Sequence, residues 1–352
     1  MIIIENKNLQ TKPTDYKQLG FGKVFTDYMI MSKYQDGKWQ EIVIQPFQNL
    51  SLHPAATCLH YAQEVFEGLK AYRGDDGVIR LFRHRDNIKR LNESCRRICI
   101  PEVDEDALEK AIIEIIKLEA SWIFEDEDTA LYIRPAIFGT GNELGVHPSK
   151  EYILCVILSP VAKYYQNKED YVKIKIEEHF HRVGKLGTGT AKTGGNYASS
   201  LLSSVIAEEE GFDQVCWLDA ETSKYIEEVG SMNIFFVIKG VLITPMLNTS
   251  ILDGITRRSI ITLAKQMGIS VEERKVSIDE VFAAAQCGEL TEVFGSGTAA
   301  VISKVGMLKK AEQEIILPRL KDGVADILLS QLKGIQYGRI HEDYGWITTI
   351  QE

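Results

Sequence analysis

Apolar side chains recur along the first part of the chain at spacings that predict both strands and helices. Residues 78–91, VIRLFRHRDNIKRL, pass from an alternating stretch, typical of a strand, into a helical one. Residues 104–122, DEDALEKAIIEIIKLEASW, repeat their apolar positions at helical spacing, so the predicted helix has one apolar face. The residues of that face are Leu108, Ala111, Ile112, Ile115 and Ile116.

Two predicted strands and a polar break follow this helix. Residues 129–138, TALYIRPAIF, and residues 151–161, EYILCVILSPV, are rich in β-branched and aromatic residues, which favour strands. The polar stretch YYQNKEDYV over residues 164–172 interrupts the pattern. Because 352 residues exceed what a single core usually holds, we predict a small α+β domain over residues 1–167 and a larger domain over residues 168–352.

The second part of the chain mixes further strands and helices. KIKIEEHF, from residue 173, alternates as a strand does, and YASSLLSSVIAEEEG, from residue 197, predicts a helix. The apolar face of that helix is predicted to be Leu201, Leu202, Val205 and Ile206. Later strands are predicted at QVCWLD, MNIFFVI and VLITP, and later helices at RRSIITLAKQMG and SIDEVFAAAQCG, the last with a capping box from Ser277 to Glu280. The fold class is therefore α+β, a mixed α/β arrangement with mixed sheets.

Composition and charge narrow the possible partners. The chain is 45% hydrophobic and 26% charged, which is typical of a globular protein. A formal net charge of -10 argues against nucleic acid or an anionic membrane surface as a partner. The first residues, MIIIENKNLQ, have neither a basic start nor a long apolar region, so we expect a cytoplasmic location.

The six cysteines are scattered through the chain, and several lie in apolar runs such as YILCVIL and QVCWLD. We interpret them as reduced core residues. Cys95 and Cys99 are four residues apart on a predicted helix, a spacing that could bring two metal ligands together. No second pair or nearby histidine completes such a set, so no metal site is predicted.

A lysine in a glycine-rich loop is the first candidate for chemistry. Residues 187–200 read GTGTAKTGGNYASS, which allows two interpretations. A phosphate-binding loop needs glycine directly before Lys192 and again five residues earlier, where this chain has Ala191 and Leu186. The alternative is a nucleophilic amine that small neighbours keep uncrowded, so that a flat cofactor can lie against it.

Further sequence blocks along the chain make the interpretation of the lysine loop specific. They are EEVGSMNIF, ILDGITRRS and EVFGSGTAA in the second part, and FGKVFTDYM, QNLSLHPAATCLHYAQEVFEGLKAYRG, LFRHRDNIKRL, LYIRPAIFGTG and LSPVAKYY in the first. Together with the lysine loop, they resemble the branched-chain aminotransferases of fold type IV among the pyridoxal-phosphate enzymes. The resemblance covers nearly the whole chain from about Phe21. It implies a two-domain architecture with pyridoxal 5'-phosphate at the domain interface.

The resemblance also implies roles for cofactor-binding residues. Lys192 would hold the cofactor as a Schiff base and move a proton between the substrate α-carbon and the cofactor. Glu228 would keep the ring nitrogen protonated, whereas its neighbour Glu227 is expected to be solvated. Tyr197 would bind the phenolic oxygen. The phosphate would be bound by Arg90, by the helix start at Ile255 and Thr256, and by Thr298, and Ser231 would add a cofactor contact.

The substrate pocket follows from the same resemblance. The wall residues would be Phe21, Tyr61, Phe66, Tyr132 and Tyr164. The backbone amides of Thr298 and Ala299 would hold the α-carboxylate, and Arg134 would bind the distal carboxylate of glutamate. Val146, at the tip of the loop over residues 141–148, would close over the pocket of a neighbouring subunit, which implies at least a homodimer.

The implied activity is reversible amino transfer from leucine, isoleucine or valine to 2-oxoglutarate. A D-amino acid aminotransferase or an aminodeoxychorismate lyase of the same fold is the nearest alternative; a nucleotide-binding protein and a non-enzymatic relative are further ones. Some family members carry a CxxC pair after the GSGTA motif, where this chain has Ala300 and Ser303. We therefore predict no thiol redox switch at this place.

Overall fold

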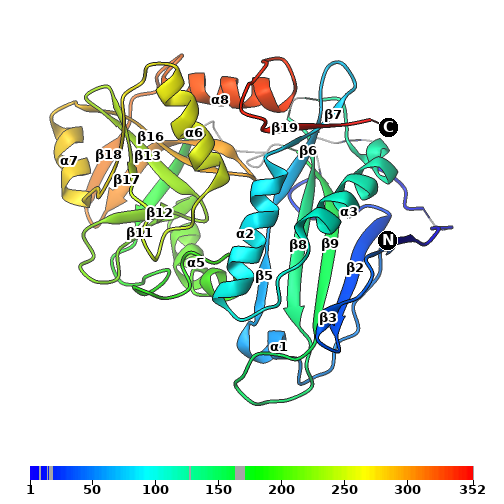
Figure 1. The fold of residues 1–352 in the computed structure, drawn as a ribbon. Helices are drawn as coiled ribbons and strands as arrows, with labels where there is room; N and C mark the ends of the chain where they lie inside the picture. Colours follow the sequence, from blue (N-terminus) through cyan, green and yellow to red (C-terminus); the bar gives the residue numbers. More distant parts are fainter. Residues whose placement is uncertain (8, 14, 16–18, 127, 163–170, 352) are drawn as a thin grey trace. The chain divides into compact units, whose positions relative to one another are not determined.

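The computed structural model describes residues 1–7, 9–13, 15, 19–126, 128–162 and 171–351. The chain divides into two compact units, which are described one at a time (Figure 1). Unit 1 comprises Met1–Gln166, Ala191–Gly194 and Lys333–Glu352, and unit 2 comprises Asn167–Thr190 and Gly195–Leu332. The predicted boundary between residues 167 and 168 lies outside the described residues. No helix of the described chain is long and apolar enough to cross a membrane.

Unit 1 is built on a ten-stranded sheet in the order β1-β4-β2-β9-β8-β6-β7-β19, with β3 paired to β2 and β5 to β8. Its strands are β1 (Ile2–Ile3), β2 (Tyr28–Gln35), β3 (Lys38–Trp39), β4 (Val43–Pro46), β5 (Glu64–Phe66), β6 (Leu69–Arg73), β7 (Ile79–Phe82), β8 (Ala130–Gly139), β9 (Tyr152–Val161) and β19 (Ile347–Ile350). The pairing is antiparallel from β4 through β19, whereas β1 and β4 are parallel. The two strands predicted from residues 129 and 151 are the long central pair β8 and β9.

Two helices cover one face of this sheet, α2 (His84–Arg97) and α3 (Glu105–Leu118) (Figure 1). All five predicted apolar positions of α3 are fully buried in the core of unit 1, which confirms the predicted face. Asp104 caps α3, because its side chain accepts a hydrogen bond from Ala107 N at 2.8 Å. The short helices of this unit are α1 (Thr57–Tyr61) and η2 (Ala120–Trp122).

Unit 2 contains a nine-stranded sheet in the order β12-β11-β10-β17-β16-β13-β14-β15, with β18 paired to β17. Its strands are β10 (Tyr171–Ile176), β11 (Gln214–Leu218), β12 (Ile226–Val229), β13 (Asn233–Ile238), β14 (Val241–Pro245), β15 (Val271–Arg274), β16 (Leu290–Gly297), β17 (Val301–Lys310) and β18 (Gln313–Ile316). β10 is parallel to both of its neighbours, whereas β11 and β12 are antiparallel. The predicted α+β class with a mixed sheet is therefore confirmed.

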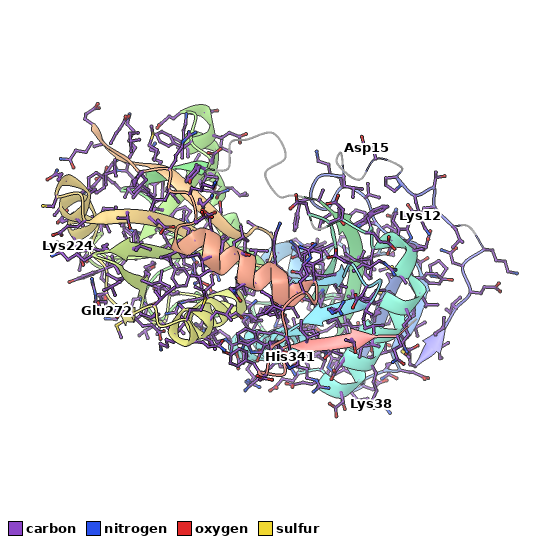
Figure 2. The ribbon with its side chains drawn as sticks, turned by 90° about the horizontal axis from the view of Figure 1, so that it is seen from above. Lys12, Asp15, Lys38, Lys224, Glu272 and His341 are labelled. Carbon is purple, nitrogen blue, oxygen red and sulfur yellow. The ribbon has the colours of Figure 1, made fainter. Side chains whose placement is uncertain are left out.

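The helices of the second part are α4 (Gly194–Ala198), α5 (Leu201–Glu209), α6 (Ile255–Gln266), α7 (Ile278–Gln286) and α8 (Val324–Gln336). Ser277 caps α7 by accepting from Glu280 N at 3.1 Å, as predicted. Charged side chains lie exposed on both units, among them Lys38, Lys224 and His341 (Figure 2). This distribution agrees with the average globular composition.

The predicted buried face of α5 is wrong. Leu201, Leu202 and Val205 are 63%, 56% and 50% exposed, whereas Ser203 and Ala207 are buried. Ala207 packs in a cluster with the β11 residues Val215 and Trp217. Small side chains let the helix approach the sheet closely, so tertiary packing selected the face that periodicity assigned to solvent.

Candidate active site

Lys192 is fixed in unit 1 through its own backbone. Its N–H donates to Ser94 Oγ of α2 at 2.9 Å, and its carbonyl accepts from Phe66 N of β5 at 3.0 Å. Its Nζ lies 4.7 Å from the centroid of the Phe66 ring. The backbone of this half-buried residue is therefore anchored by two hydrogen bonds, and its amine lies over an aromatic face.

Four predicted substrate residues form a continuous wall beside this lysine. The Arg134 guanidinium lies 4.6 Å from the centroid of the Phe66 ring and donates to Tyr132 OH at 2.8 Å. Phe21 packs edge-on against Tyr132, with 4.7 Å between the ring centroids. Strand alternation along β8 explains the arrangement, because Tyr132 and Arg134 share one face while Ile133 points into the core of unit 1.

Two other predicted pocket residues, Tyr61 and Val146, belong to α1 and to the loop over residues 141–148. Tyr61 OH donates to the carbonyl of Leu144, within the loop over residues 141–148. Val146 of this loop is 86% exposed. Tyr164 lies outside the described residues. Among the described residues, Tyr61 thus contacts the predicted loop. Phe21, Phe66, Tyr132 and Arg134 form the contacts that lead to Lys192.

Arg90 is buried on α2 and forms an ion pair with Glu67, which was not predicted. Arg90 Nε lies 2.6 Å from Glu67 Oε1, and Nη2 lies 3.1 Å from Oε2. Burial by itself raises the pKa of Glu67, but Arg90 and Lys192 outweigh that effect and leave the pKa below its ordinary value. The sequence signal for this ion pair is weak, because Glu67 shows there only as a carboxylate between Phe66 and Gly68.

Glu228 lies on β12 of unit 2 as a buried anion. Arg182 Nε is 2.9 Å from its Oε2, and Leu252 N donates to its Oε1 at 2.9 Å. The expectation that Glu227 is solvated is wrong, because it is buried and accepts hydrogen bonds from Ser250 Oγ and Asn248 Nδ2. All four residues of β12 are buried, so this strand has no solvent face on which a carboxylate could lie.

The N-terminus of α6 offers backbone donors in unit 2. Gly254 is its N-cap and provides no side-chain acceptor, while the first residues, Ile255 and Thr256, are buried. An uncapped helix start has unpaired N–H groups and a partial positive charge, which suit a phosphate. The phosphate-binding role of Ile255 and Thr256 stays a prediction.

The other predicted residues of unit 2 lie in turns and short helices. Thr298 and Ala299 are half-buried in the turn between β16 and β17, and Ser231 is exposed in the turn between β12 and β13. Tyr197 is half-buried in α4. Near the first turn, Ser296 Oγ is buried without a hydrogen-bond partner among the described residues.

Comparisons with known proteins agree over nearly the whole chain. Residues 64–306 match the family model for amino-transferase class IV. The chain is 48% identical to branched-chain-amino-acid aminotransferase 2 of Bacillus subtilis, with 99% of this chain and 97% of the relative covered. It is 50% identical to a probable branched-chain-amino-acid aminotransferase of Staphylococcus aureus, with 98% and 96% covered. The chain belongs to the branched-chain-amino-acid aminotransferase family.

Solved structures of this aminotransferase family share the fold. The Escherichia coli branched-chain amino acid aminotransferase superposes with a TM-score of 0.76 at 29% identity, covering 92% of this chain and 99% of that one. The T.th. branched-chain amino acid aminotransferase, complexed with N-(5'-phosphopyridoxyl)-L-glutamate, has a TM-score of 0.73 at 26% identity, with 92% and 98% covered. The predicted family, enzyme class and fold are confirmed.

The cysteines of this family member differ in part from the prediction. Cys95, Cys155 and Cys216 are buried, whereas Cys99 and Cys287 are exposed, and all six are free thiols. Cys99 follows the end of α2, where the backbone turns with a positive φ, so it leaves the core that Cys95 joins. Within the described ranges, no group of three or more His, Cys, Asp or Glu side chains could hold a metal ion.

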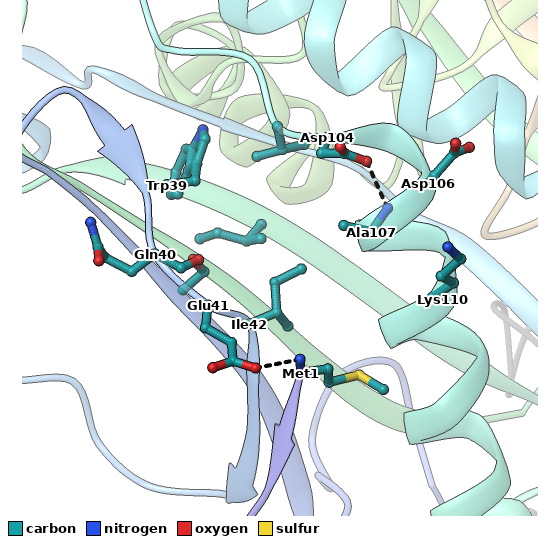
Figure 3. A pocket seen from close by; sticks show the side chains of 12 residues that line it. Met1, Trp39, Gln40, Glu41, Ile42, Asp104, Asp106, Ala107 and Lys110 are labelled. Carbon is teal, nitrogen blue, oxygen red and sulfur yellow. Dashed lines mark hydrogen bonds and ion pairs between the residues drawn. The ribbon is translucent and has the colours of Figure 1, made fainter.

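One cavity of about 580 Å³ contains none of the predicted site residues (Figure 3). It lies in unit 1 between the start of α3 and the β2–β4 edge, with Trp39 and Ile42 on its wall. Its charged groups include Glu41, which is paired with the Met1 amino group, and Asp104, which caps α3. Both contacts are internal to unit 1.

Proposed function

We propose that this chain catalyses the reversible, pyridoxal-phosphate-dependent transfer of an amino group from L-leucine, L-isoleucine or L-valine to 2-oxoglutarate. The products are branched-chain 2-oxo acids and L-glutamate. The proposal rests on one observation. The Lys192 amine lies against the Phe66 ring, and the Arg134–Tyr132 pair lies next to the same ring. This surface combines a reactive amine, apolar rings and one cation, as a pocket for both aliphatic and acidic side chains requires.

The chain's residues fit pyridoxal 5'-phosphate. When bound, this cofactor supplies a reactive aldehyde and an electron-withdrawing ring for amino-group exchange. Lys192 provides the amine that carries it and moves the proton at the substrate α-carbon. Glu228, paired with Arg182, provides the anion that keeps a ring nitrogen protonated. Relatives support this assignment, since one solved family structure contains pyridoxamine 5'-phosphate.

The phosphate and the substrate use the remaining predicted residues. Phosphate binding is assigned to Arg90, Ile255, Thr256 and Thr298, and further cofactor contacts to Tyr197 and Ser231. Phe21, Phe66 and Tyr132 pack against the aliphatic side chain. Arg134 binds the distal carboxylate of glutamate, and the amides of Thr298 and Ala299 bind the α-carboxylate. Tyr61, Val146 and Tyr164 complete the proposed pocket.

A homodimer is the smallest assembly we propose. The exposed apolar side chains Leu201, Leu202 and Val205 on α5 form a patch that a second copy would cover. Val146 is almost fully exposed, as expected of a loop tip that serves a neighbouring subunit. We further propose that the enzyme acts in the cytoplasm, without nucleic-acid or membrane partners.

Borohydride reduction of the cofactor-loaded enzyme, followed by peptide mapping, tests the function. We expect the phosphopyridoxyl group on Lys192 and turnover of L-leucine but not of D-alanine. Replacing Lys192→Ala removes the only predicted nucleophilic amine, so kcat with L-leucine should fall by at least about a thousandfold. The matched control is Lys185→Ala, an exposed lysine just before this loop that pairs with Glu221.

Two outcomes would contradict the proposal. Undiminished turnover by the Lys192→Ala variant would remove the lysine from the chemistry. Preference for D-alanine over L-leucine would instead indicate a D-amino acid aminotransferase of the same fold.

A further inference from the structure

We propose that Glu67 is a positioning residue of this active site, which orients the Arg90 guanidinium and supplies the negative charge that faces the Lys192 amine. The inference rests on the proposed function, because Arg90 and Lys192 are there the phosphate-binding and cofactor-carrying residues. Glu67 itself would touch neither substrate nor cofactor. It acts through the two cations.

The first argument is the geometry of the ion pair. Arg90 presents one edge of its guanidinium to the carboxylate, with Nε 2.6 Å from Oε1 and Nη2 3.1 Å from Oε2. Two parallel bonds fix both the plane and the direction of a guanidinium, which a single bond does not. The edge that carries Nη1 therefore points away from Glu67.

The second argument is that the carboxylate is itself immobile. Asn87 Nδ2 donates to Oε2 at 2.8 Å, and Gly68 N donates to the same oxygen at 3.0 Å. The backbone N–H of Glu67 donates to the Pro135 carbonyl of β8 at 2.8 Å. Glu67 is fully buried, so water does not compete for these bonds.

The third argument is that one face of α2 joins the residues concerned. Asn87 and Arg90 are three positions apart on this helix and both bind Glu67. Ser94 lies one turn further on the same face and accepts from the backbone N–H of Lys192. A shift of the Glu67 carboxylate would therefore act on helix α2, and the same helix binds the backbone of Lys192.

The fourth argument is charge. A fully buried carboxyl would ordinarily be neutral, but the nearby cations Arg90 and Lys192 keep Glu67 ionised. The same attraction acts on the two cations, so loss of the carboxylate charge removes a favourable interaction beside the Lys192 amine. Positioning and charge thus have separate measurable consequences.

The test compares Glu67→Gln with Glu67→Asp in the full-length, cofactor-loaded enzyme. For Glu67→Gln we expect release of pyridoxal 5'-phosphate during dialysis to be about tenfold faster, because Arg90 loses its orienting anion. The pH midpoint of the visible absorbance of the bound cofactor should fall by about one unit. Glu67→Asp keeps the charge on a shorter side chain, so it should restore the midpoint while release stays fast.

A matched control separates this role from a structural one. Glu109→Gln also removes a carboxylate that pairs with α2, through His84 and Arg85, at a place away from Arg90. It should lower the thermal midpoint without changing cofactor release or the absorbance midpoint.

Each outcome decides the proposal. Wild-type values of release and absorbance midpoint in Glu67→Gln would overturn the role of Glu67 while the proposed function stood. If Glu67→Gln fails to fold, Glu67→Asp decides: fast release with a normal midpoint supports the proposal, and unchanged release overturns it. A wild-type enzyme that binds no pyridoxal 5'-phosphate would overturn both, which distinguishes the two failures.

Discussion

Glu119 is a buried carboxyl group of unit 1 that has no predicted part in the chemistry. It accepts a hydrogen bond from Tyr28 N at 2.6 Å, while Asp27 and Lys12 are nearby charges. Burial, more than any other effect, raises its pKa to about 7. The group is therefore protonated in the folded state over a pH range in which the unfolded chain has lost the proton.

Because its folded pKa is raised, Glu119 favours folding most strongly below about pH 4.5 and loses this contribution as the pH rises through about 7. The variant Glu119→Gln stays neutral at every pH and can still accept from Tyr28 N. Above pH 7 we expect its free energy of unfolding to exceed that of the wild type by about 1 to 3 kcal/mol. Urea titrations at pH 5 and pH 8 measure this, with the exposed Glu125→Gln as control. A variant no more stable than the wild type at pH 8 would contradict the assignment.

For Lys192, Arg90 and Glu228, the sequence predicted a role because the proposed chemistry demands one residue type at each place. Glu67 was not found, because an ion-pair partner is recognisable only once α2 and β5 are side by side. Glu227 was misjudged because strand alternation implies one solvent face, which β12 lacks. The roles of these residues stay predictions until they are tested.

At the scale of elements, the lysine loop packs closely on the loop over residues 246–254, at Ser250. A Cβ atom on Gly189 would lie 2.4 Å from Ser250 Cα, closer than real Cβ atoms approach. Thr188 and Asn196 hold the loop together through hydrogen bonds of 2.6 and 2.8 Å. Ser250 in turn donates to Glu227. The sequence suggested that small residues leave room for a cofactor, and the structure adds a backbone contact as a second reason for glycine.

Gly189→Ala should therefore destabilise unit 2. The clash is with backbone atoms that cannot rotate away, so we expect a loss of about 2 kcal/mol in the free energy of unfolding. Gly184→Ala is the control, since a Cβ there meets nothing within 4 Å. Chemical denaturation of both variants makes the comparison. Equal stability of the two would show that the loop shifts at no cost.

Helices and long strands were predicted well because periodicity reflects the local backbone, as in α3 and β8. The orientation of α5 was not predicted correctly, because periodicity identifies two faces of a helix but not which of them meets the sheet. Ala207 packs against β11 because its small side chain allows close approach there, and Ser203 is also buried. What covers the opposite, apolar face is a question about the whole assembly.

At the scale of the whole molecule, assembly is the property that α5 allows us to test. Replacing Leu201→Glu and Leu202→Glu together places charges on the exposed apolar patch. If two copies meet there, burying these charges costs several kcal/mol, and the variant should have half the mass of the wild type in light scattering. Ile316→Glu, at an exposed position on β18, is the control and should leave the mass unchanged. A dimeric double variant would exclude α5 as the contact.

A single boundary in the sequence does not describe the two units, because each unit consists of several chain segments. Unit 1 takes in Ala191–Gly194 and Lys333–Glu352, two segments separated from its main part by unit 2. The later segment is anchored to the first part of the chain, since Lys333 pairs with Asp128 and Tyr337 OH donates to the Thr129 carbonyl. The return of these later segments to unit 1 depends on tertiary packing, which leaves no periodic signal in the sequence.

The position of β19 has a consequence for how the protein is made. Residues 347–350 complete the sheet of unit 1 by pairing with β7, yet they leave the ribosome after all of unit 2. During synthesis, β7 therefore presents an unpaired edge for as long as translation of the intervening residues lasts. That edge is open to other nascent chains until its own partner emerges.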